Sequence, residues 1–461
     1  MPSRFSFSLF VLLFCGCGSY FAPKAPLAQP IQEDEEVKIS RQFRREAKTH
    51  FKLVNHPEIE RYVDQIGRRI LSVTGPQPFD YRFFVVDDPQ LNAFAVPGGS
   101  IYVFTGLLEQ ANSTGELAAV IGHEIIHIKD RHMARLSGPD PLSLLALLGV
   151  LLGRGGAGAQ AAGALGQALA ASRQFAYTRQ VELEADTLGV RYMAQAGYDP
   201  RAALSFIKTM DQQRVLNPVN IPPYLQTHPL TQERVANVER IIRSLDLARP
   251  KFEAPDPIKR IQVILRLERH DGDAVIAEYE RLVSQHSDSA EARHLLAIAQ
   301  HYQGRLPQAR ENYEKARALD PGRADLDRDL GRLYSQIGEF QLAHQALDRS
   351  LSAEPREPLN YLYLGELFEK ESNLPEAANA YFRAHNLSPL WPLPPDRLGI
   401  AYGKMNRLGD AYYYLGRSQL LQDEDDKAIA HFERAIKDFG PASPRSQVIK
   451  EELEVLKARR R

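Results

Sequence analysis

Apolar residues recur every three or four positions between Leu117 and Ile128, which is the spacing of a helix with one buried face. Ser113 and Glu116 precede this run as an S-x-x-E capping box, and Gly138 marks its end. The pattern therefore predicts one helix of about six turns between these signals.

Around this helix the pattern predicts a small sheet and further helices. Residues 81–86 and 101–105 are rich in β-branched and aromatic side chains, and a Pro-Gly-Gly loop lies between them, which indicates two strands. Helical spacing is also present at residues 59–70, and another helix is expected from 178 to 197. These elements favour an α+β domain, mainly helical with a small sheet, over residues 38–248.

Residues 142–171 begin with an apolar run and continue with many Gly and Ala residues. About a dozen apolar residues are too few to cross a bilayer, which takes about 20. Two interpretations are open for this segment. It is either a buried or loosely packed helical hairpin, or a surface that faces a membrane or a partner.

Beyond a Pro-rich boundary near residue 250, the sequence repeats with a period of 34 residues. Small residues keep this period at two positions of the unit and proline keeps it at a third: Ala297, Gly331, Gly365 and Gly399; Ala309, Ala343, Ala377 and Ala411; Pro321, Pro355 and Pro389. Small residues where two helices touch are typical of the tetratricopeptide repeat. We expect an all-α repeat solenoid over residues 255–440 and a charged tail over residues 441–461.

The first residues indicate export from the cytoplasm. Arg4 precedes an apolar run at residues 5–14, which is typical of a secretory leader, expected here over residues 1–21. The residues around Cys17 resemble a bacterial lipoprotein signal, so Cys17 is the candidate for lipidation. Simple cleavage, or retention of the leader as an anchor, is the alternative. A Pro-rich tether is expected over residues 22–37.

Composition adds two limits. The chain has 461 residues, enough for two or three domains, and both of its cysteines lie in the leader, so the expected domains contain no disulfide. Its formal net charge of -1 gives no reason to expect nucleic acid as a partner, because phosphate binding requires a concentrated basic surface.

The predicted helix carries the sequence HEIIH at residues 123–127. Side chains four apart share a helix face, so His123 and His127 present two imidazoles to one metal ion. Glu124 lies beside them and is placed to take a proton from a bound water, as in the H-E-x-x-H arrangement of zinc peptidases. His132 follows on the same predicted helix, too far along to share the ion, and we expect it to be structural.

A catalytic zinc site also needs a third protein ligand and an open position for water. Glu182 is a candidate, and Asp186 follows one helical turn later on the same face, where a second acid would orient a ligand. Glu184 projects to a different side. From these residues alone, a solvated acidic helix face is an equal alternative, and a loop histidine before proline, such as His228, is more often a surface residue.

HEIIH at residues 123–127 followed by ELEAD at residues 182–186 resembles the gluzincin metallopeptidases of the HtpX and CAAX prenyl protease family. The resemblance covers roughly residues 40–245. Membrane members of the family carry spanning helices, and none is predicted here, so the chain is similar to the soluble branch. The resemblance implies a zincin-like fold and hydrolysis of peptide bonds.

The resemblance also implies a role for each residue of the site. One Zn²⁺ per chain is expected to be held by three protein ligands, with a general base beside it and a supporting acid behind it: His123, His127 and Glu182 as ligands, Glu124 as base, and Asp186 as support. The segment Thr227-His228-Pro229, with Arg234 after it, matches a motif of the soluble branch. The resemblance implies that His228 lies on a loop that reaches the metal, as a fourth ligand or gate, and holds the enzyme inactive.

The expected function is that of a zinc-dependent endopeptidase in the periplasm of a Gram-negative bacterium, tethered to the outer membrane. It would degrade misfolded or stalled outer-membrane proteins, which would add as an extended strand beside residues 101–105. Expected partners are these unfolded substrates, the outer-membrane assembly machinery through the repeats, and the membrane surface through a lipid anchor. The alternative is a repeat-based chaperone or scaffold in which proteolysis is secondary or silenced.

Overall fold

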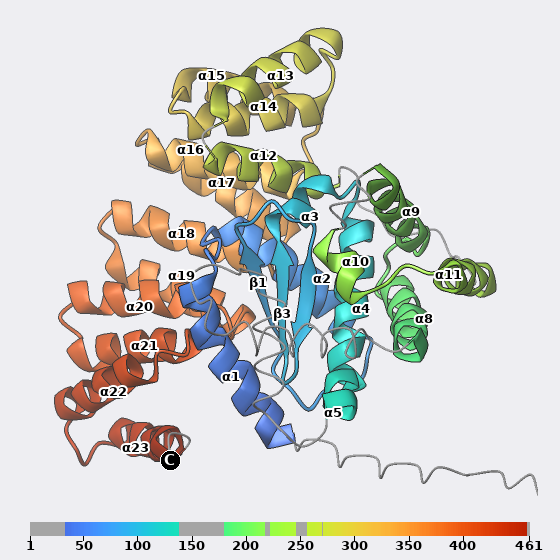
Figure 1. Ribbon diagram of the computed structural model, residues 1–461. Coiled ribbons are helices and arrows are strands. Elements are labelled where there is room, and N and C mark those ends of the chain that lie inside the picture. The colour runs from blue at the N-terminus through green and yellow to red at the C-terminus, as the bar shows by residue number, and fades with distance from the viewer. Residues whose placement is uncertain (1–32, 138–178, 217–221, 246–255, 270, 459–461) are drawn as a thin grey trace, which may run out of the picture.

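The computed structural model describes residues 33–137, 179–216, 222–245, 256–269 and 271–458 (Figure 1). The predicted leader with Cys17 and the apolar segment 142–171 lie outside the described residues. Within them, a mainly helical first part with a small sheet is followed by a long series of paired helices. The expected fold class is confirmed.

Three strands form the sheet in the order β1-β3-β2: β1 Arg82–Val86, β2 Ala93–Val96 and β3 Ser100–Phe104. The central strand β3 is parallel to β1 and antiparallel to β2. Gly98 and Gly99 connect β2 to β3 with φ angles of +84° and +108°, a backbone conformation that glycine adopts without steric cost. The sequence pattern does not predict β2, because a run of four residues is too short to show a strand period.

Different helices cover the two faces of the sheet. Ile101 of β3 belongs to the main core, which includes α2 (Pro57–Leu71) and α4 (Thr114–Lys129). Tyr102, the next residue, points to the opposite face and meets Phe43 of α1 edge to face, with 5.3 Å between the ring centroids. The sheet is therefore buried on both faces.

Helix α1 spans Glu33–His50. Residues 33–37, which the sequence analysis assigns to the tether, are thus helical, and Glu36 is buried. Burial raises the pKa of Glu36 to about 7, although Arg131 beside it lowers the pKa. The start of the first part therefore lies earlier in the chain than the pattern indicates.

Helix α4 begins where the sequence predicts, because the hydroxyl of Ser113 accepts a hydrogen bond from the backbone nitrogen of Glu116 at 3.3 Å. It ends earlier than predicted. Arg131 has a φ of +53°, and a second short helix, α5 (His132–Ser137), begins after it. The predicted helix of about six turns is therefore wrong in length, and His132 opens a separate helix.

Five further helices lie in the described residues of the first part: α3 Thr105–Gln110, α8 Arg179–Gln195, α9 Arg201–Leu216, α10 Pro223–Thr227 and α11 Gln232–Ser244. Both α8 and α9 pack against α4, and α11 packs against α8 and α9. Figure 1 shows α4 between the sheet and α8, so the HEIIH residues lie in the interior of this part.

The second part consists of antiparallel helix pairs, and its helices are α12 Ile258–Glu268, α13 Gly272–Gln285, α14 Ala290–Tyr302, α15 Leu306–Leu319, α16 Ala324–Gln336, α17 Phe340–Ala353, α18 Pro358–Lys370, α19 Leu374–Leu387, α20 Leu393–Lys404, α21 Leu408–Leu421, α22 Asp425–Phe439 and α23 Pro444–Ala458. The periodic glycines lie where two helices of a pair touch. A Cβ atom on Gly331 would lie 2.6 Å from Cγ of Leu347, and one on Gly365 would lie 2.4 Å from the Tyr381 ring. The predicted solenoid is confirmed.

The last helix, α23, lies in the segment predicted as a charged tail. Its Ile449, Leu453 and Leu456 are buried in a small core with Phe432 of α22. This apolar spacing of three to four residues covers the end of the solenoid, as a terminal repeat requires.

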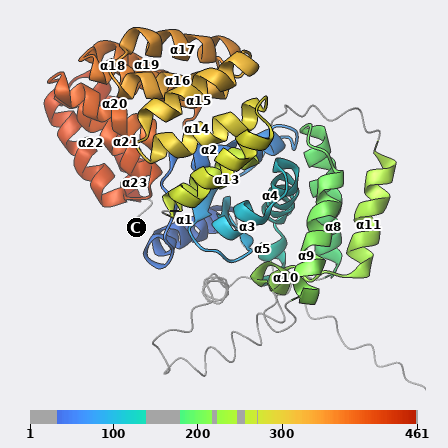
Figure 2. The ribbon, with the colours of Figure 1, turned by 90° about the horizontal axis from the view of Figure 1, so that it is seen from above.

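The repeats curve around α1 and α2 of the first part (Figures 1 and 2). Near one end of the solenoid, Nε of Arg260 donates to Oε2 of Glu58 at 2.7 Å. Near the other end, Nε of Arg44 donates to Oδ2 of Asp423 at 2.6 Å. The repeats therefore dock on the first part of the same chain along most of their length.

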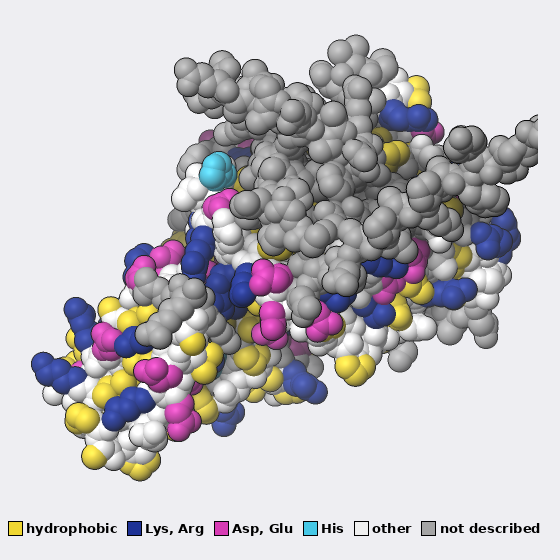
Figure 3. All heavy atoms as spheres, turned by 60° about the horizontal axis from the view of Figure 1, so that its bottom comes forward, with side chains coloured by type: hydrophobic (Ala, Val, Ile, Leu, Met, Phe, Trp, Pro, Cys, Tyr) yellow, Lys and Arg dark blue, Asp and Glu magenta, His cyan; other side chains and the backbone are white. Residues whose placement is uncertain are grey.

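Positively and negatively charged side chains are interspersed over the described part of the face shown in Figure 3. Among the residues that the structure describes, no helix has the length and apolar character needed to cross a bilayer.

Candidate metal centre

Helices α4 and α8 approach each other closely at the site. Gly122 of α4 faces Gly189 of α8, and a Cβ atom on Gly189 would lie 3.1 Å from the backbone nitrogen of His123. Glycine at both positions allows the two backbones to come this near. This contact brings Glu182 of α8 within reach of both histidines of the HEIIH sequence.

Four buried side chains direct one ligand atom each toward a common point. Nε2 of His123 lies 2.9 Å from Nε2 of His127 and 3.2 Å from Nδ1 of His228. Oε1 of Glu182 lies 3.4 Å from Nε2 of His127 and 3.1 Å from Nδ1 of His228. Tetrahedral zinc with bonds of roughly 2.0 to 2.1 Å holds its ligand atoms about 3.3 Å apart. The donor set and its spacing therefore fit zinc.

Glu182 is held in its ionised form. Burial raises its pKa, but the charges of His228, Arg234 and His123 outweigh burial and hold the pKa well below the usual range of a glutamate. Nη1 of Arg234 lies 2.8 Å from Oε2 of Glu182. An ionised carboxylate with two imidazoles is the His₂Glu donor set of catalytic zinc sites.

Glu124 lies beside the ligand group without joining it. Its side chain is fully buried, and neither carboxyl oxygen has a hydrogen-bond partner among the described residues. Nε2 of His228 lies 3.4 Å from its Oε1. Burial raises the pKa of Glu124 above its usual value. A buried carboxyl group without a fixed partner is suited to exchange a proton with a nearby water.

Asp186 supports His123 from the side opposite to the ligand group. Its Oδ1 lies 3.0 Å from Nδ1 of His123, which directs Nε2 of the same ring toward the other ligands. Nε and Nη2 of Arg234 donate to the two oxygens of Asp186 at 2.7 and 2.8 Å. Nη1 of Arg234 donates to the backbone carbonyl of His228 at 3.2 Å. Arg234, to which the sequence analysis assigns no role, thus joins Asp186 to the loop that carries His228.

His132 lies closer to the site than its position in the sequence indicates. Its Nδ1 is hydrogen-bonded to Nδ1 of His127 at 2.9 Å, and its Nε2 lies 3.3 Å from Oε2 of Glu184. The helix break at Arg131 directs His132 back toward His127, so the expectation that it lies on the same helix is wrong, while His132 stays outside the ligand group, as expected. Glu184 points away from the ligand group, as expected, but it reaches His132.

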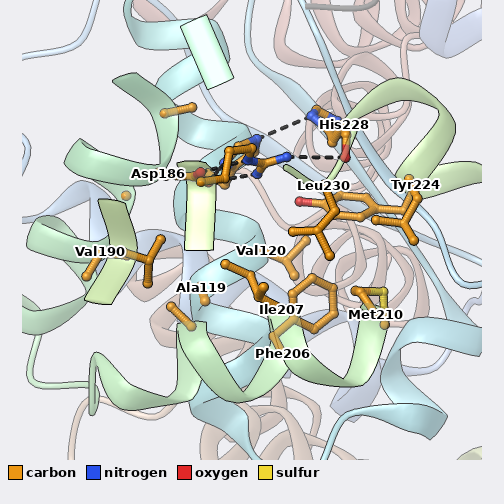
Figure 4. Close-up of a pocket in the computed structure, with 17 residues that line it drawn as sticks. Ala119, Val120, Asp186, Val190, Phe206, Ile207, Met210, Tyr224, His228 and Leu230 are labelled. Atoms are coloured by element: carbon orange, nitrogen blue, oxygen red, sulfur yellow. Dashed lines mark hydrogen bonds and ion pairs between the residues drawn. The ribbon is translucent and has the colours of Figure 1, made fainter. Parts of the chain in front are cut away.

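An apolar pocket adjoins the ligand group, between α4, α8, α9 and α10 (Figure 4). The ring centroids of Tyr224 and His228 are 4.7 Å apart, so Tyr224 forms one wall of the pocket beside the histidine. Its other apolar lining includes Val120, Val190, Phe206, Ile207, Met210 and Leu230. Such a lining accepts an apolar side chain.

Fold and site together define a class: a mainly helical metallopeptidase domain with a His-Glu donor set, followed by helical repeats. Residues 57–242 match the model of Peptidase family M48, and residues 262–324 and 301–364 match models of the tetratricopeptide repeat. The chain therefore combines a domain of peptidase family M48 with tetratricopeptide repeats.

Curated relatives carry the names of proteases. A relative from Vibrio cholerae is 30% identical over 255 residues, which are 54% of this chain and 52% of the relative. Beta-barrel assembly-enhancing protease of Escherichia coli is 30% identical over 210 residues, which are 44% of this chain and 43% of the relative. Mitochondrial metalloendopeptidase OMA1 of Schizosaccharomyces pombe is 30% identical over 179 residues, or 39% of this chain and 51% of the relative. The chain thus spans about half the length of these relatives.

Proposed function

We propose that this chain is a zinc-dependent endopeptidase of the cell envelope that degrades misfolded or stalled outer-membrane proteins. The observation that supports the activity is the meeting of His123, His127 and Glu182 within 3.5 Å of one another, beside the buried Glu124. In this proposal the first three residues hold one zinc ion and Glu124 is the general base.

Zinc at this position supplies Lewis acidity, which activates water and polarises a peptide carbonyl. Glu124 takes the proton from the attacking water and delivers it to the departing amine. Asp186 accepts the Nδ1 proton of His123 and so keeps Nε2 of that ring available as a ligand. Arg234 holds Asp186 in place from the opposite side.

The strand β2 is the proposed docking edge for an extended substrate. From the sequence, the substrate is expected beside residues 101–105, but β3 is hydrogen-bonded to a neighbour on each side and has no free edge. That expectation is wrong. Among the residues that the structure describes, β2 pairs only with β3, and it packs against α4, which carries Glu124. Main-chain hydrogen bonds to β2 would bind unfolded chains with little sequence preference.

His228 accounts for a closed resting state in this proposal. Its Nδ1 faces the ligand group while its Nε2 faces Glu124, so one ring takes the fourth ligand position and contacts the base. Water reaches Glu124 only after this ring moves. Arg234, which binds the carbonyls of His228 and Pro229, holds the loop in the closed position.

Location and substrate rest on the sequence and on the relatives' names. The predicted leader supports export, and Cys17 as its lipidated residue would tether the chain to the outer membrane. The name beta-barrel assembly-enhancing protease, carried by the Escherichia coli relative, supports outer-membrane proteins as substrates. The repeats would then recruit substrate or the assembly machinery through the surface that does not dock on the first part.

A scaffold in which proteolysis is normally silenced is the second candidate function. One observation favours it: His228 lies 3.2 Å from Nε2 of His123 and 3.4 Å from Oε1 of Glu124, so its ring would fill the position that a catalytic water needs. The repeats would then act as the main binding surface, and the peptidase domain would support them.

The experiment compares the mature protein with its Glu124→Gln variant in a background that carries His228→Ala, so that the site is open. We measure zinc per chain and cleavage of casein. The proposal expects one zinc in both proteins and loss of cleavage with Glu124→Gln, while the surface control Glu451→Gln cleaves normally. Cleavage that survives Glu124→Gln, or a chain that binds no zinc, would contradict it.

A further inference from the structure

The second nitrogen of each zinc-binding histidine needs a partner. A histidine that ligates through Nε2 carries its proton on Nδ1, and an acceptor for this proton sets the ring orientation. Asp186 is that acceptor for His123, at 3.0 Å. Nδ1 of His132 lies within hydrogen-bond distance of Nδ1 of His127, at 2.9 Å. The two ligands are therefore supported by different chemical groups.

The arrangement determines where the protons lie. If His127 binds zinc through Nε2, as the proposed function holds, its Nδ1 is the donor and Nδ1 of His132 must be the acceptor. A neutral imidazole has one proton, so the proton of His132 is then on Nε2. That nitrogen lies 3.3 Å from Oε2 of Glu184. Nδ1 of His127 thus faces an acceptor, whereas the N–H of His132 lies near the carboxylate of Glu184 without a hydrogen bond to it.

We propose that His132 and Glu184 are positioning residues for the zinc ligand His127. His132 accepts the Nδ1 proton of His127, and the negative charge of Glu184 near Nε2 favours the tautomer of His132 that is able to accept it. The inference rests on the proposed zinc site, but it concerns the binding of the metal rather than the cleavage of a peptide.

The local backbone explains why these residues meet. The positive φ of Arg131 ends α4 and turns His132 back over the last turn of that helix, where its ring is fully buried. Glu184 comes from α8, between Glu182 and Asp186. Residues 182–186 of α8 therefore supply three groups. Glu182 is the proposed ligand, Asp186 contacts the ligand His123, and Glu184 lies near His132, which contacts the ligand His127.

The same cluster has a competing interpretation as a second metal site. Ligand atoms of Asp130, His132 and Glu184 lie within 4.8 Å of one another, and Nε2 of His132 has no hydrogen-bond partner among the described residues. A metal on Nε2 would place the proton of His132 on Nδ1. Two N–H groups, from His127 and His132, would then face each other at 2.9 Å. The tautomers therefore disfavour a second metal while His127 binds zinc.

The test measures zinc affinity by competition with a chelator, using the whole mature protein. His132→Leu removes the acceptor, and we expect its zinc affinity to fall about 10- to 100-fold, the usual effect of losing an outer support. His132→Asn places a carbonyl oxygen close to the position of Nδ1 and should recover most of the affinity. Circular dichroism shows whether each variant is folded.

The zinc affinities of two further variants are also compared with that of the parent. Glu184→Gln keeps an acceptor without the charge, so we expect a loss smaller than that of His132→Leu. The matched control is His344→Leu, which breaks a similar histidine–glutamate contact, 2.9 Å from Glu371, far away in the repeats. It should leave the zinc affinity unchanged.

A folded His132→Leu protein with the zinc affinity of the parent would overturn the proposal. Two zinc ions per chain in the parent, one of them lost in His132→Leu, would also overturn it in favour of the second metal site. The proposed function fails on a different result, which is zinc binding without any cleavage when His228 is replaced. The two ideas are therefore separable.

Discussion

Arg260 of α12 and Glu58 of α2 form a buried ion pair that joins the repeats to the peptidase domain, with Nε of the arginine 2.7 Å from Oε2 of the glutamate. The same guanidinium donates to Oδ1 of Asp329 at 2.8 Å. Arg332 also reaches Glu58, through Nη1, at 2.8 Å. Burial raises the pKa of Glu58, but Arg260 and Arg332 outweigh it and hold the pKa low. Arg260 thus lies between two buried carboxylates from different parts of the chain.

Replacing Arg260 should destabilise the docked repeats. The variant Arg260→Met leaves the buried negative charges of Glu58 and Asp329 without the positive charge of Arg260. Breaking a buried ion pair in this way lowers the free energy of unfolding by about 3 to 5 kcal/mol. Urea unfolding of the full chain measures the loss. The control is Arg266→Met on the same helix, whose pairs with Asp271 and Glu278 are partly exposed; it should cost less than about 1 kcal/mol. Equal effects of the two substitutions would show that the buried pair does not stabilise the docking.

Replacing His228 should increase resting proteolysis. The variant His228→Ala removes the ring that contacts both the ligand group and Glu124. A closed state favoured by about 1.4 kcal/mol leaves roughly a tenth of the molecules open, so we expect at least about a tenfold rise in casein cleavage. Zinc content should stay at one per chain, because His123, His127 and Glu182 remain. Unchanged or lower cleavage at full zinc occupancy would count against a gating role.

Stability should depend on pH through Glu60. Burial raises the pKa of this carboxyl to about 7, although the Trp391 indole, which donates to it at 3.2 Å, lowers the pKa. A carboxyl group with a higher pKa in the folded chain binds a proton on folding, so stability falls as the pH rises from about 5 to above 7. Thermal unfolding at pH 5.5 and 8 measures this fall.

The variant Glu60→Gln should reduce the difference in unfolding temperature between pH 5.5 and 8, because its side chain does not titrate. The exposed Glu46→Gln change on α1 serves as the control and should keep the difference of the parent protein. If the unfolding temperature of the Glu60 variant changed with pH as much as that of the parent, the pH dependence would come from the titration of another group.

A side chain at Gly189 should separate helices α4 and α8. In Gly189→Ala the added Cβ would lie 3.1 Å from the backbone nitrogen of His123, and overpacking of this kind costs about 1 to 3 kcal/mol. We expect a lower unfolding temperature and weaker zinc binding. Gly403→Ala is the matched control, because its Cβ would meet only Ala411, at 3.8 Å; there alanine should stabilise the helix by about 0.5 to 1 kcal/mol. Stabilisation by both substitutions would refute the close contact.

Local patterns were sufficient for much of the fold. The 34-residue period predicts the solenoid because each repeat must place small residues where its helices touch, and Gly331 and Gly365 do so. The capping residues Ser113 and Glu116 mark the start of α4 for the same kind of local reason. β2 was not predicted because a run of four residues is too short to show a strand period. The end of α4 was not predicted because arginine rarely adopts the positive φ that Arg131 has here.

The sequence by itself determined most of the helices, the repeats and the groups available for chemistry, such as His123, Glu124, His127 and Glu182, because helical spacing, caps and motifs are properties of short segments. Only the tertiary structure decided which of these segments meet. Contacts such as His132 with His127, Arg234 with Asp186, and Arg260 with Glu58 join residues that lie on different helices. Their distances depend on helix packing and on a single backbone turn, and neither is encoded by the spacing of residues along one helix.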